Sequence, residues 1–353
     1  MTVPKMKLAV LFLSLISAIT CTAFAQSGRT KKPAASQDRD QGTIHLSTEE
    51  ATLLINVTYL KDEQVPLRPT DLTVLEKDLK HQVTSVTRAP ASVVLVIDNC
   101  VFNSAAKFKD IDANLALGME IVRRLPPTDR ISVVTYADRV NILSYWTSNR
   151  ADLEKQVTWK FKPGNKPLLY KALSQASDQL LANAPDPRIV ILISDGVGSG
   201  DADEMEDARQ ALDKARATVY IASQNALIVR KLEPSANNKL ARYKTIFEPD
   251  AKKILADQRL YLGYLQAATD RMQNLADSSG GGFWNAENEP DFRDLQRQII
   301  REIGSEYVIN YLTEPGGKAG DFREVKVSCT NPGAVVRVRK NVFVAPTPPK
   351  SER

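Results

Sequence analysis

The chain has 353 residues, of which 43% are hydrophobic and 25% are charged, and its formal net charge is +5. This is the composition of a globular protein with room for about two domains of ordinary size. The small positive surplus argues against a nucleic-acid-binding protein. The apolar run near the N-terminus is too short to span a bilayer, and no other segment reaches the roughly 18 apolar residues of a membrane-spanning helix.

The first 25 residues have the pattern of a secretory signal peptide. Lys5 and Lys7 precede the apolar run LAVLFLSLISAI, and the small-x-small sequence AFA ends at Ala25. We expect cleavage between Ala25 and Gln26, which removes two lysines and lowers the formal charge to +3. The sequence therefore predicts a secreted or periplasmic protein.

A β-rich region is predicted after a short leader. Residues 26–42 lack aromatic side chains and β-branched runs, which predicts a disordered leader. Within 43–90, the stretches ATLLINVTYL and DLTVLEKDLKHQVTSVTR alternate apolar and polar residues with a period of two. This alternation is typical of antiparallel strands with one exposed face.

Residues 91–304 alternate strands and helices. The runs SVVLVID, ending at Asp98, and RIVILISD, ending at Asp195, are apolar on both faces, as buried parallel strands are. Helices are predicted near 105–124, 168–182 and 201–215, and DFRDLQRQIIREI is predicted to form the last one. The pattern predicts a doubly wound, mostly parallel α/β sheet.

A long polar insertion at 224–262 interrupts this alternation. It contains eight Lys and Arg against four Asp and Glu, with Tyr243, Phe247 and Tyr261 interleaved. One interpretation is a flap that shapes a partner-binding surface, since long connections in compact domains are often functional. The other is a solvated excursion with a helix packed on the side of the domain.

The segment 305–345 returns to the alternation of the N-terminal region, in YVINYL, REVKVSCT and AVVRVRKNVFV, and a tail follows at 346–353. We therefore expect the two ends of the chain to build one β-rich part. A disulfide between Cys100 and Cys329 is not expected, because a full strand length would separate a rim residue from this part.

The two strand-end aspartates are the principal candidate site. Ligands of open α/β sheets gather beyond the carboxyl ends of the strands, so Asp98 and Asp195 should share one rim. They form either a metal or partner site, or a pair of caps for the backbone amides that follow. Cys100 is either a reactive thiolate at a helix N-terminus or a small buried filler.

The order of these elements, with the strings SVVLVID, ILISDG and RVRKNVF, resembles the von Willebrand factor type A fold, specifically secreted bacterial proteins related to it. The resemblance implies an α/β domain inserted in a β-sandwich formed by the N- and C-terminal segments. It also implies a metal-ion-dependent adhesion site, in which an Asp-x-Ser-x-Ser stretch, a threonine and a further aspartate hold Mg²⁺ through hard oxygen atoms.

This sequence keeps only part of that ligand set. Asp98 and Asp195 match the two aspartates, whereas Cys100 and Phe102 stand at the two serine positions. A thiol is a soft ligand and a poor choice for Mg²⁺. The site is therefore expected to be degenerate.

Other residues near the rim could compensate for the missing hydroxyls. Lys166 and Pro167 occur where relatives carry a threonine, and a lysine ammonium near two aspartates could replace the charge of the cation. Asn103 and Ser104 are near enough in the sequence to offer substitute oxygen atoms.

We therefore expect an exported protein-interaction or adhesion module that needs no cofactor and binds a protein partner at the carboxyl-end rim. The residues expected to line this rim are Asp98, Cys100, Asn103, Ser104, Lys166 and Asp195. One alternative is metal-dependent adhesion through a rebuilt Mg²⁺ or Ca²⁺ site, and the other is an uncharacterised hydrolase. Both histidines, His45 and His81, fall in the N-terminal β region, so no Ser-His-Asp or Cys-His arrangement can be placed at the rim.

Overall fold

The computed structural model describes residues 49–59, 65–101, 108–236, 249–313, 322–339 and 342–343. The predicted signal peptide, leader and C-terminal tail lie outside these ranges, as do Phe102, Asn103 and Ser104. Within them, no helix combines the length and the apolar character needed to cross a membrane.

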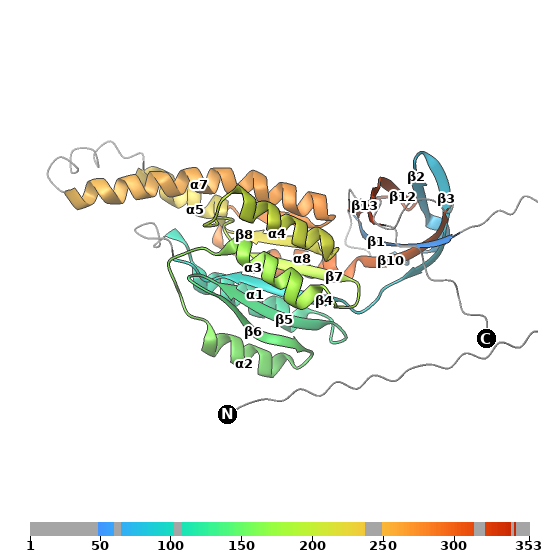
Figure 1. Cartoon of the computed structure of the whole chain (residues 1–353), viewed down its shortest axis with the longest axis horizontal. Helices are drawn as coiled ribbons and strands as arrows, with labels where there is room; N and C mark the ends of the chain where they lie inside the picture. The colour runs from blue at the N-terminus through green and yellow to red at the C-terminus, as the bar shows by residue number, and fades with distance from the viewer. Residues whose placement is uncertain are drawn as a thin grey trace, which may run out of the picture. The chain divides into compact units, whose positions relative to one another are not determined.

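The predicted doubly wound sheet is confirmed. Six strands lie in the order β6-β5-β4-β7-β8-β9, and every pair is parallel except β5 and β6. Figure 1 shows β6 to β8 of this sheet side by side. All residues of β4 and β8 are buried, which explains why their sequences are apolar on both faces. The strands are β4 (Ser92–Asp98), β5 (Arg130–Tyr136), β6 (Val140–Thr147), β7 (Arg188–Ile193), β8 (Thr218–Ser223) and β9 (Gly282–Asn285).

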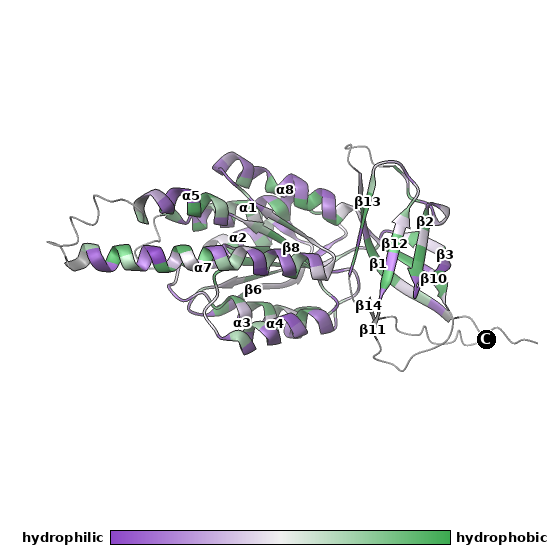
Figure 2. Cartoon of the chain, turned by 90° about the horizontal axis from the view of Figure 1, so that it is seen from above, coloured by the Kyte–Doolittle hydropathy of each residue, from purple (hydrophilic) through white to green (hydrophobic). Residues whose placement is uncertain are grey.

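Helices cover both faces of this sheet. On one face, Val93, Leu95 and Ile97 of β4 pack with apolar residues of α1 (Ile111–Arg124), α2 (Arg150–Lys160) and α8 (Glu289–Gly304). On the other face, Val94 and Val96 pack with residues of α3 (Leu169–Gln175), the π-helical turn η3 (Ala176–Leu181), α4 (Ala202–Lys214) and α7 (Pro249–Ser279). Figure 2 shows hydrophilic and hydrophobic residues alternating along α8, as expected for a helix with one buried side.

The predicted insertion contributes two helices that pack against each other. They are α5 (Asn225–Ala236) and the start of α7, and residues 237–248 between them lie outside the described ranges. Ile228 and Leu232 of α5 form a small apolar cluster with Tyr261 and Leu265 of α7. This part of the insertion is therefore packed into the fold.

The two ends of the chain build one antiparallel sheet, which confirms the predicted β-sandwich-like part. The order is β12-β2-β3-β10-β1-β13, so strands from before and after the α/β region are interleaved in one sheet. Their bounds are β1 (Glu49–Tyr59), β2 (Leu72–Glu76), β3 (Leu79–Thr87), β10 (Glu306–Thr313), β12 (Val325–Cys329) and β13 (Ala334–Val338). A 3-10 turn, η1 (Pro69–Asp71), precedes β2, and a small separate pair joins β11 (Phe322–Arg323) to β14 (Val342–Phe343).

This sheet must curl, because the strands at the two ends of its order are consecutive in the sequence. The chain from Cys329 to Ala334 spans at most about 18 Å, whereas the outer strands of a flat six-stranded sheet lie about 24 Å apart. The curled sheet encloses its own apolar core, which includes Leu53, Val74 and Ile309.

Hydrogen bonds join the β-rich part to the α/β part. The Asn56 side-chain amide of β1 donates to the Glu302 carbonyl oxygen at 2.7 Å and to the Tyr220 hydroxyl at 3.1 Å. Tyr220 in turn donates to the buried Glu306 carboxyl group at the start of β10. Burial raises the pKa of Glu306 to about 8.

Candidate functional site

The structure brings Asp98 and Asp195 together around a lysine. Asp98 ends β4 and Asp195 follows the neighbouring parallel strand β7. The Lys109 ammonium lies 2.7 Å from Asp98 Oδ2 and 2.7 Å from Asp195 Oδ2. We refer to these three residues as the lysine-bridged site.

Lys109 is an internal cation. Its side chain is only 2% exposed, and it lies directly before Asp110, the N-cap residue of α1. Burial acts to lower the pKa of Lys109, but the charges of Asp195 and Asp98 outweigh it and raise this pKa above its ordinary value. Lys109 therefore carries its charge at neutral pH.

The remaining carboxylate oxygens are also hydrogen-bonded. Asp98 Oδ1 accepts the Cys100 backbone amide at 2.8 Å, and Asp195 Oδ1 accepts the Val197 amide at 2.9 Å. Each aspartate thus stabilises the turn after its strand and also binds Lys109, so the sequence-based cap interpretation describes part of its role.

A tyrosine from the insertion completes the site. The Tyr261 hydroxyl of α7 donates to Asp195 Oδ2 at 2.6 Å. Burial and the negative charge of Asp195 raise the pKa of Tyr261, which keeps the hydroxyl protonated as a donor. Burial also raises the pKa of Asp98, and the charge of Asp195 adds to this effect while Lys109 opposes it.

Buried amide side chains hold the backbone of both aspartates. Asn114 Nδ2 of α1 donates to the Asp98 carbonyl oxygen at 3.0 Å. Asn225 Nδ2 of α5 donates to the Asp195 carbonyl oxygen and to that of Leu265 in α7, each at 2.9 Å. The helices on both sides of the insertion are therefore tied to the lysine-bridged site.

Cys100 and Cys329 are both free thiols. Cys100 is fully buried, and burial raises its pKa to about 12, with the charge of Asp98 adding to the effect. A neutral, enclosed thiol is a poor nucleophile, so Cys100 is a small buried filler and not a reactive thiolate.

Lys166 does not supply the ammonium between the aspartates. Its side chain is exposed, and its backbone amide donates to Asp138 Oδ1 at 2.8 Å. Lys109 occupies the position that the sequence analysis gave to Lys166. No pattern singled Lys109 out, because a lysine just before a helix is usually solvated.

The described residues at this position do not fit a divalent metal. Mg²⁺ requires about six hard oxygen ligands, but the facing oxygens of Asp98 and Asp195 already bind the Lys109 ammonium, whose charge repels a metal cation. Within the described ranges, no group of three or more His, Cys, Asp or Glu residues is arranged to hold a metal ion.

An open cavity of about 710 Å³ lies at the same rim. It is lined by Asn99 after β4, by the β5–β6 turn, and by the end of α2 with the loop that follows. Its lining includes Asp138, Arg139, Trp159 and Lys162, and Trp159 is 82% exposed. We call this feature the rim cavity.

Residues 87–197 match the family model of the von Willebrand factor type A domain. No curated protein matches the sequence. Among solved structures, a von Willebrand factor type A protein from Catenulispora acidiphila is similar, with 11% identity, a TM-score of 0.44, and coverage of 82% of this chain and 74% of that one.

Two further solved structures are similar over smaller parts of this chain. An aerotolerance-related membrane protein from Bacteroides fragilis has 12% identity and a TM-score of 0.39, covering 62% of this chain and 99% of that one. The von Willebrand factor domain of the type V pili tip protein Mfa5 from Porphyromonas gingivalis has 24% identity and a TM-score of 0.28, covering 32% and 40%. The family assignment follows from the match at residues 87–197. The chain carries a von Willebrand factor type A domain, and the lysine-bridged site lies at the rim of its sheet.

Proposed function

We propose that this protein is an exported interaction module whose von Willebrand factor type A domain binds a protein partner at the rim without a divalent metal. The observation that carries the proposal is the Lys109 ammonium, which lies 2.7 Å from both Asp98 and Asp195. Lys109 is therefore a permanent internal cation at the position where the family resemblance implies an exchangeable metal ion.

This substitution changes how a partner is recognised. In a metal-dependent site the partner supplies a carboxylate to the metal. Here two carboxylates and one ammonium leave one net negative charge, and the side chains of all three residues are at most 2% exposed. A partner therefore has no cation to coordinate at this point, and we propose that the lysine-bridged site acts by fixing the shape of the rim.

The exposed residues around the rim cavity then make the contacts with the partner. Trp159 offers a large aromatic surface of the kind that dominates binding energy in protein interfaces. Arg139, Lys162 and Lys166 are exposed cations nearby in the rim loops. The carboxylate of Asp138 accepts the amides of Asn165 and Lys166, each at 2.8 Å, which offsets its charge. These features favour an acidic partner surface.

We also propose binding without catalysis. Neither carboxylate of the lysine-bridged site reaches solvent, so a substrate cannot approach Asp98 or Asp195 in this conformation. Acid–base catalysis requires a group within hydrogen-bond reach of the substrate.

Affinity capture with the immobilised mature protein tests the function. Proteins of the source organism that are retained are identified by mass spectrometry, with EDTA or with Mg²⁺ present. We expect a specific partner to be retained equally in both conditions. Its retention should be lost in the double variant Trp159→Ser, Lys162→Glu.

Lys214→Glu is the matched control, since Lys214 is an exposed lysine at the end of α4. It should retain the partner like the wild type. Loss of the partner in EDTA would favour the metal-dependent alternative. Equal retention by the double variant would show that the rim cavity is not the binding surface.

A further inference from the structure

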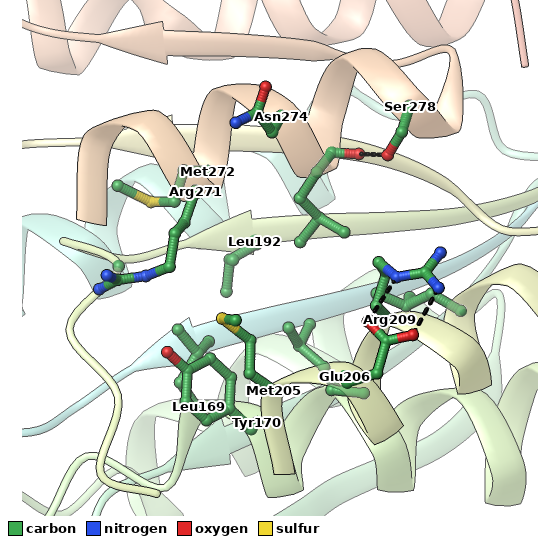
Figure 3. Close-up of a pocket in the computed structure, with 15 residues that line it drawn as sticks. Leu169, Tyr170, Leu192, Met205, Glu206, Arg209, Arg271, Met272, Asn274 and Ser278 are labelled. Carbon is green, nitrogen blue, oxygen red and sulfur yellow. Dashed lines mark hydrogen bonds and ion pairs between the residues drawn. The ribbon is translucent and has the colours of Figure 1, made fainter. Parts of the chain in front are cut away.

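A second pocket, separate from the rim cavity, lies between α4 and α7. It has a volume of about 430 Å³, and Leu192 of β7 forms its floor (Figure 3). The apolar side chains of Leu169, Leu212, Met272 and Leu275 also contribute to its lining. We call this feature the α4–α7 pocket.

The charged groups at the two ends of this pocket differ in their partners. At one end, Glu206 is paired with Arg209 at 2.5 Å, and Arg209 also binds Asp213 at 2.6 Å. Toward the other end lie the Arg271 guanidinium and the Tyr170 hydroxyl (Figure 3). In the described part of the chain, neither of these two groups has a hydrogen bond or an ion pair.

We propose that the α4–α7 pocket binds an amphipathic monocarboxylate, with its carboxylate on Arg271 and a single alkyl chain along Leu192. A guanidinium presents a fork of donors that matches a carboxylate in geometry and charge. The Tyr170 hydroxyl adds a donor at the same end of the pocket. A long apolar lining with one unpaired cation at its end complements such a molecule.

The size of the pocket favours an alkyl chain over a helix of a partner protein. The lining residues of α7 run from Arg271 to Ser278, a distance of about 10 Å along the helix. Two turns of an α-helix about 10 Å wide occupy roughly 850 Å³. That is about twice the volume of the pocket, so a helix could lie only partly within it, whereas a single extended alkyl chain matches its length.

Isothermal titration calorimetry of the mature protein with hexanoate, octanoate and decanoate, each below its micelle concentration, tests this inference. We expect one saturable site, with affinity rising about fourfold for each added methylene until the pocket is full. Neutral 1-decanol and cationic decyltrimethylammonium should bind at least about tenfold more weakly than decanoate, because they lack the anion that Arg271 recognises.

Variants distinguish recognition of the ligand's carboxylate from binding of its alkyl chain in the pocket. Arg271→Gln should weaken decanoate binding about tenfold while leaving 1-decanol unchanged. Arg297→Gln, which alters an exposed arginine of α8, is the matched control and should bind like the wild type. Ala208→Phe should fill the pocket and abolish binding, and circular dichroism verifies that each variant is folded.

Two results would overturn the inference. One is the absence of saturable binding for all three carboxylates. The other is equal affinity for decanoate and decyltrimethylammonium together with no effect of Arg271→Gln, which would mark nonspecific hydrophobic adsorption. Neither result depends on whether Ala208→Phe folds.

Discussion

The Tyr261 hydroxyl donates a 2.6 Å hydrogen bond to Asp195 Oδ2, the same oxygen that binds the Lys109 ammonium. This bond ties the long helix α7 to the interior of the rim. Part of the insertion thus packs against the lysine-bridged site and stabilises it. The contribution of this hydrogen bond to stability can be tested separately from partner binding.

Replacing Tyr261 with phenylalanine removes this donor and keeps the ring. We expect Tyr261→Phe to lower the free energy of unfolding by roughly 1–3 kcal/mol, because a buried carboxylate oxygen loses a partner. Urea denaturation measures the change. Tyr170→Phe is the control, since the Tyr170 hydroxyl has no partner in the described part of the chain, and equal losses in both variants would refute this role of the bond.

Lys109→Met leaves two buried aspartates without their cation. We expect the free energy of unfolding to fall by roughly 3–5 kcal/mol at neutral pH, as when one partner of a buried ion pair is removed. Burial and the charge of Asp195 already raise the pKa of Asp98, and loss of Lys109 raises it further. Protonation should then relieve the repulsion, so the deficit should shrink as the pH falls from 7.5 to 5.

Denaturation of Lys109→Met and wild type at both pH values measures this effect. The double variant Asp98→Asn, Lys109→Met is the matched control, because it removes one carboxylate together with the cation. It should recover part of the lost stability at pH 7.5. A deficit that does not depend on pH would argue against electrostatic bridging by Lys109.

The central strands of the α/β sheet were predictable because their hydrophobic pattern is a single strong signal. The β-branched runs at 92–98 and 188–193 are apolar on both faces because helices cover both sides of β4 and β7. The meeting of Asp98 and Asp195 follows from their places at the ends of neighbouring parallel strands.

The helices α2 and α7 have only weak hydrophobic patterns in the sequence. The helix α2 buries only Leu153 and Val157, so it has almost no apolar periodicity. In α7 the buried stripe of Tyr261, Leu265 and Ala268 has helical spacing, but polar residues surround it and its alanine is small. That spacing is the signal that could have identified α7.

The burial of Lys109 could not be predicted from the sequence. It depends on how the start of α1 lies across the ends of β4 and β7, which is a tertiary relationship. Only the fold distinguishes Lys109 from Lys166, because each is a lysine next to one polar residue in a loop.

The lysine-bridged site should not take up divalent cations. Calorimetric titration with Mg²⁺, Mn²⁺ and Ca²⁺ should give no saturable heat for the wild type, because Lys109 occupies the space and supplies the charge. Asp98→Ala serves as the comparison that removes one carboxylate ligand. Micromolar uptake that is lost in Asp98→Ala would contradict the proposed metal independence.

Gly196 should not tolerate a side chain. Its φ of +76° lies in the left-handed region, and a Cβ atom there would come within 2.4 Å of Met272 Cε. We expect Gly196→Ala to destabilise the protein by roughly 1–3 kcal/mol in thermal or urea denaturation. Gly263→Ala is the control, because a Cβ atom at this position of α7 meets nothing within 4 Å. Equal stabilities for the two variants would contradict this expectation.

The stability of the protein should fall between about pH 4.5 and pH 8 through Glu306. Burial raises the pKa of this carboxyl group from 4.5 to about 8, so in this range the folded state binds the proton more tightly than the unfolded chain. Stability from this group is greatest below pH 4.5 and is lost as the pH rises toward 8, by at most about 1.4 kcal/mol per pH unit. Glu306→Gln removes the titrating proton and keeps an oxygen that can accept the Tyr220 hydroxyl, so the variant should lose this part of the slope. Urea denaturation from pH 5 to 9 measures the pH dependence of the free energy of unfolding. Glu233→Gln, which changes an exposed carboxylate, is the control. Parallel pH profiles for wild type and Glu306→Gln would show that Glu306 does not titrate in this way.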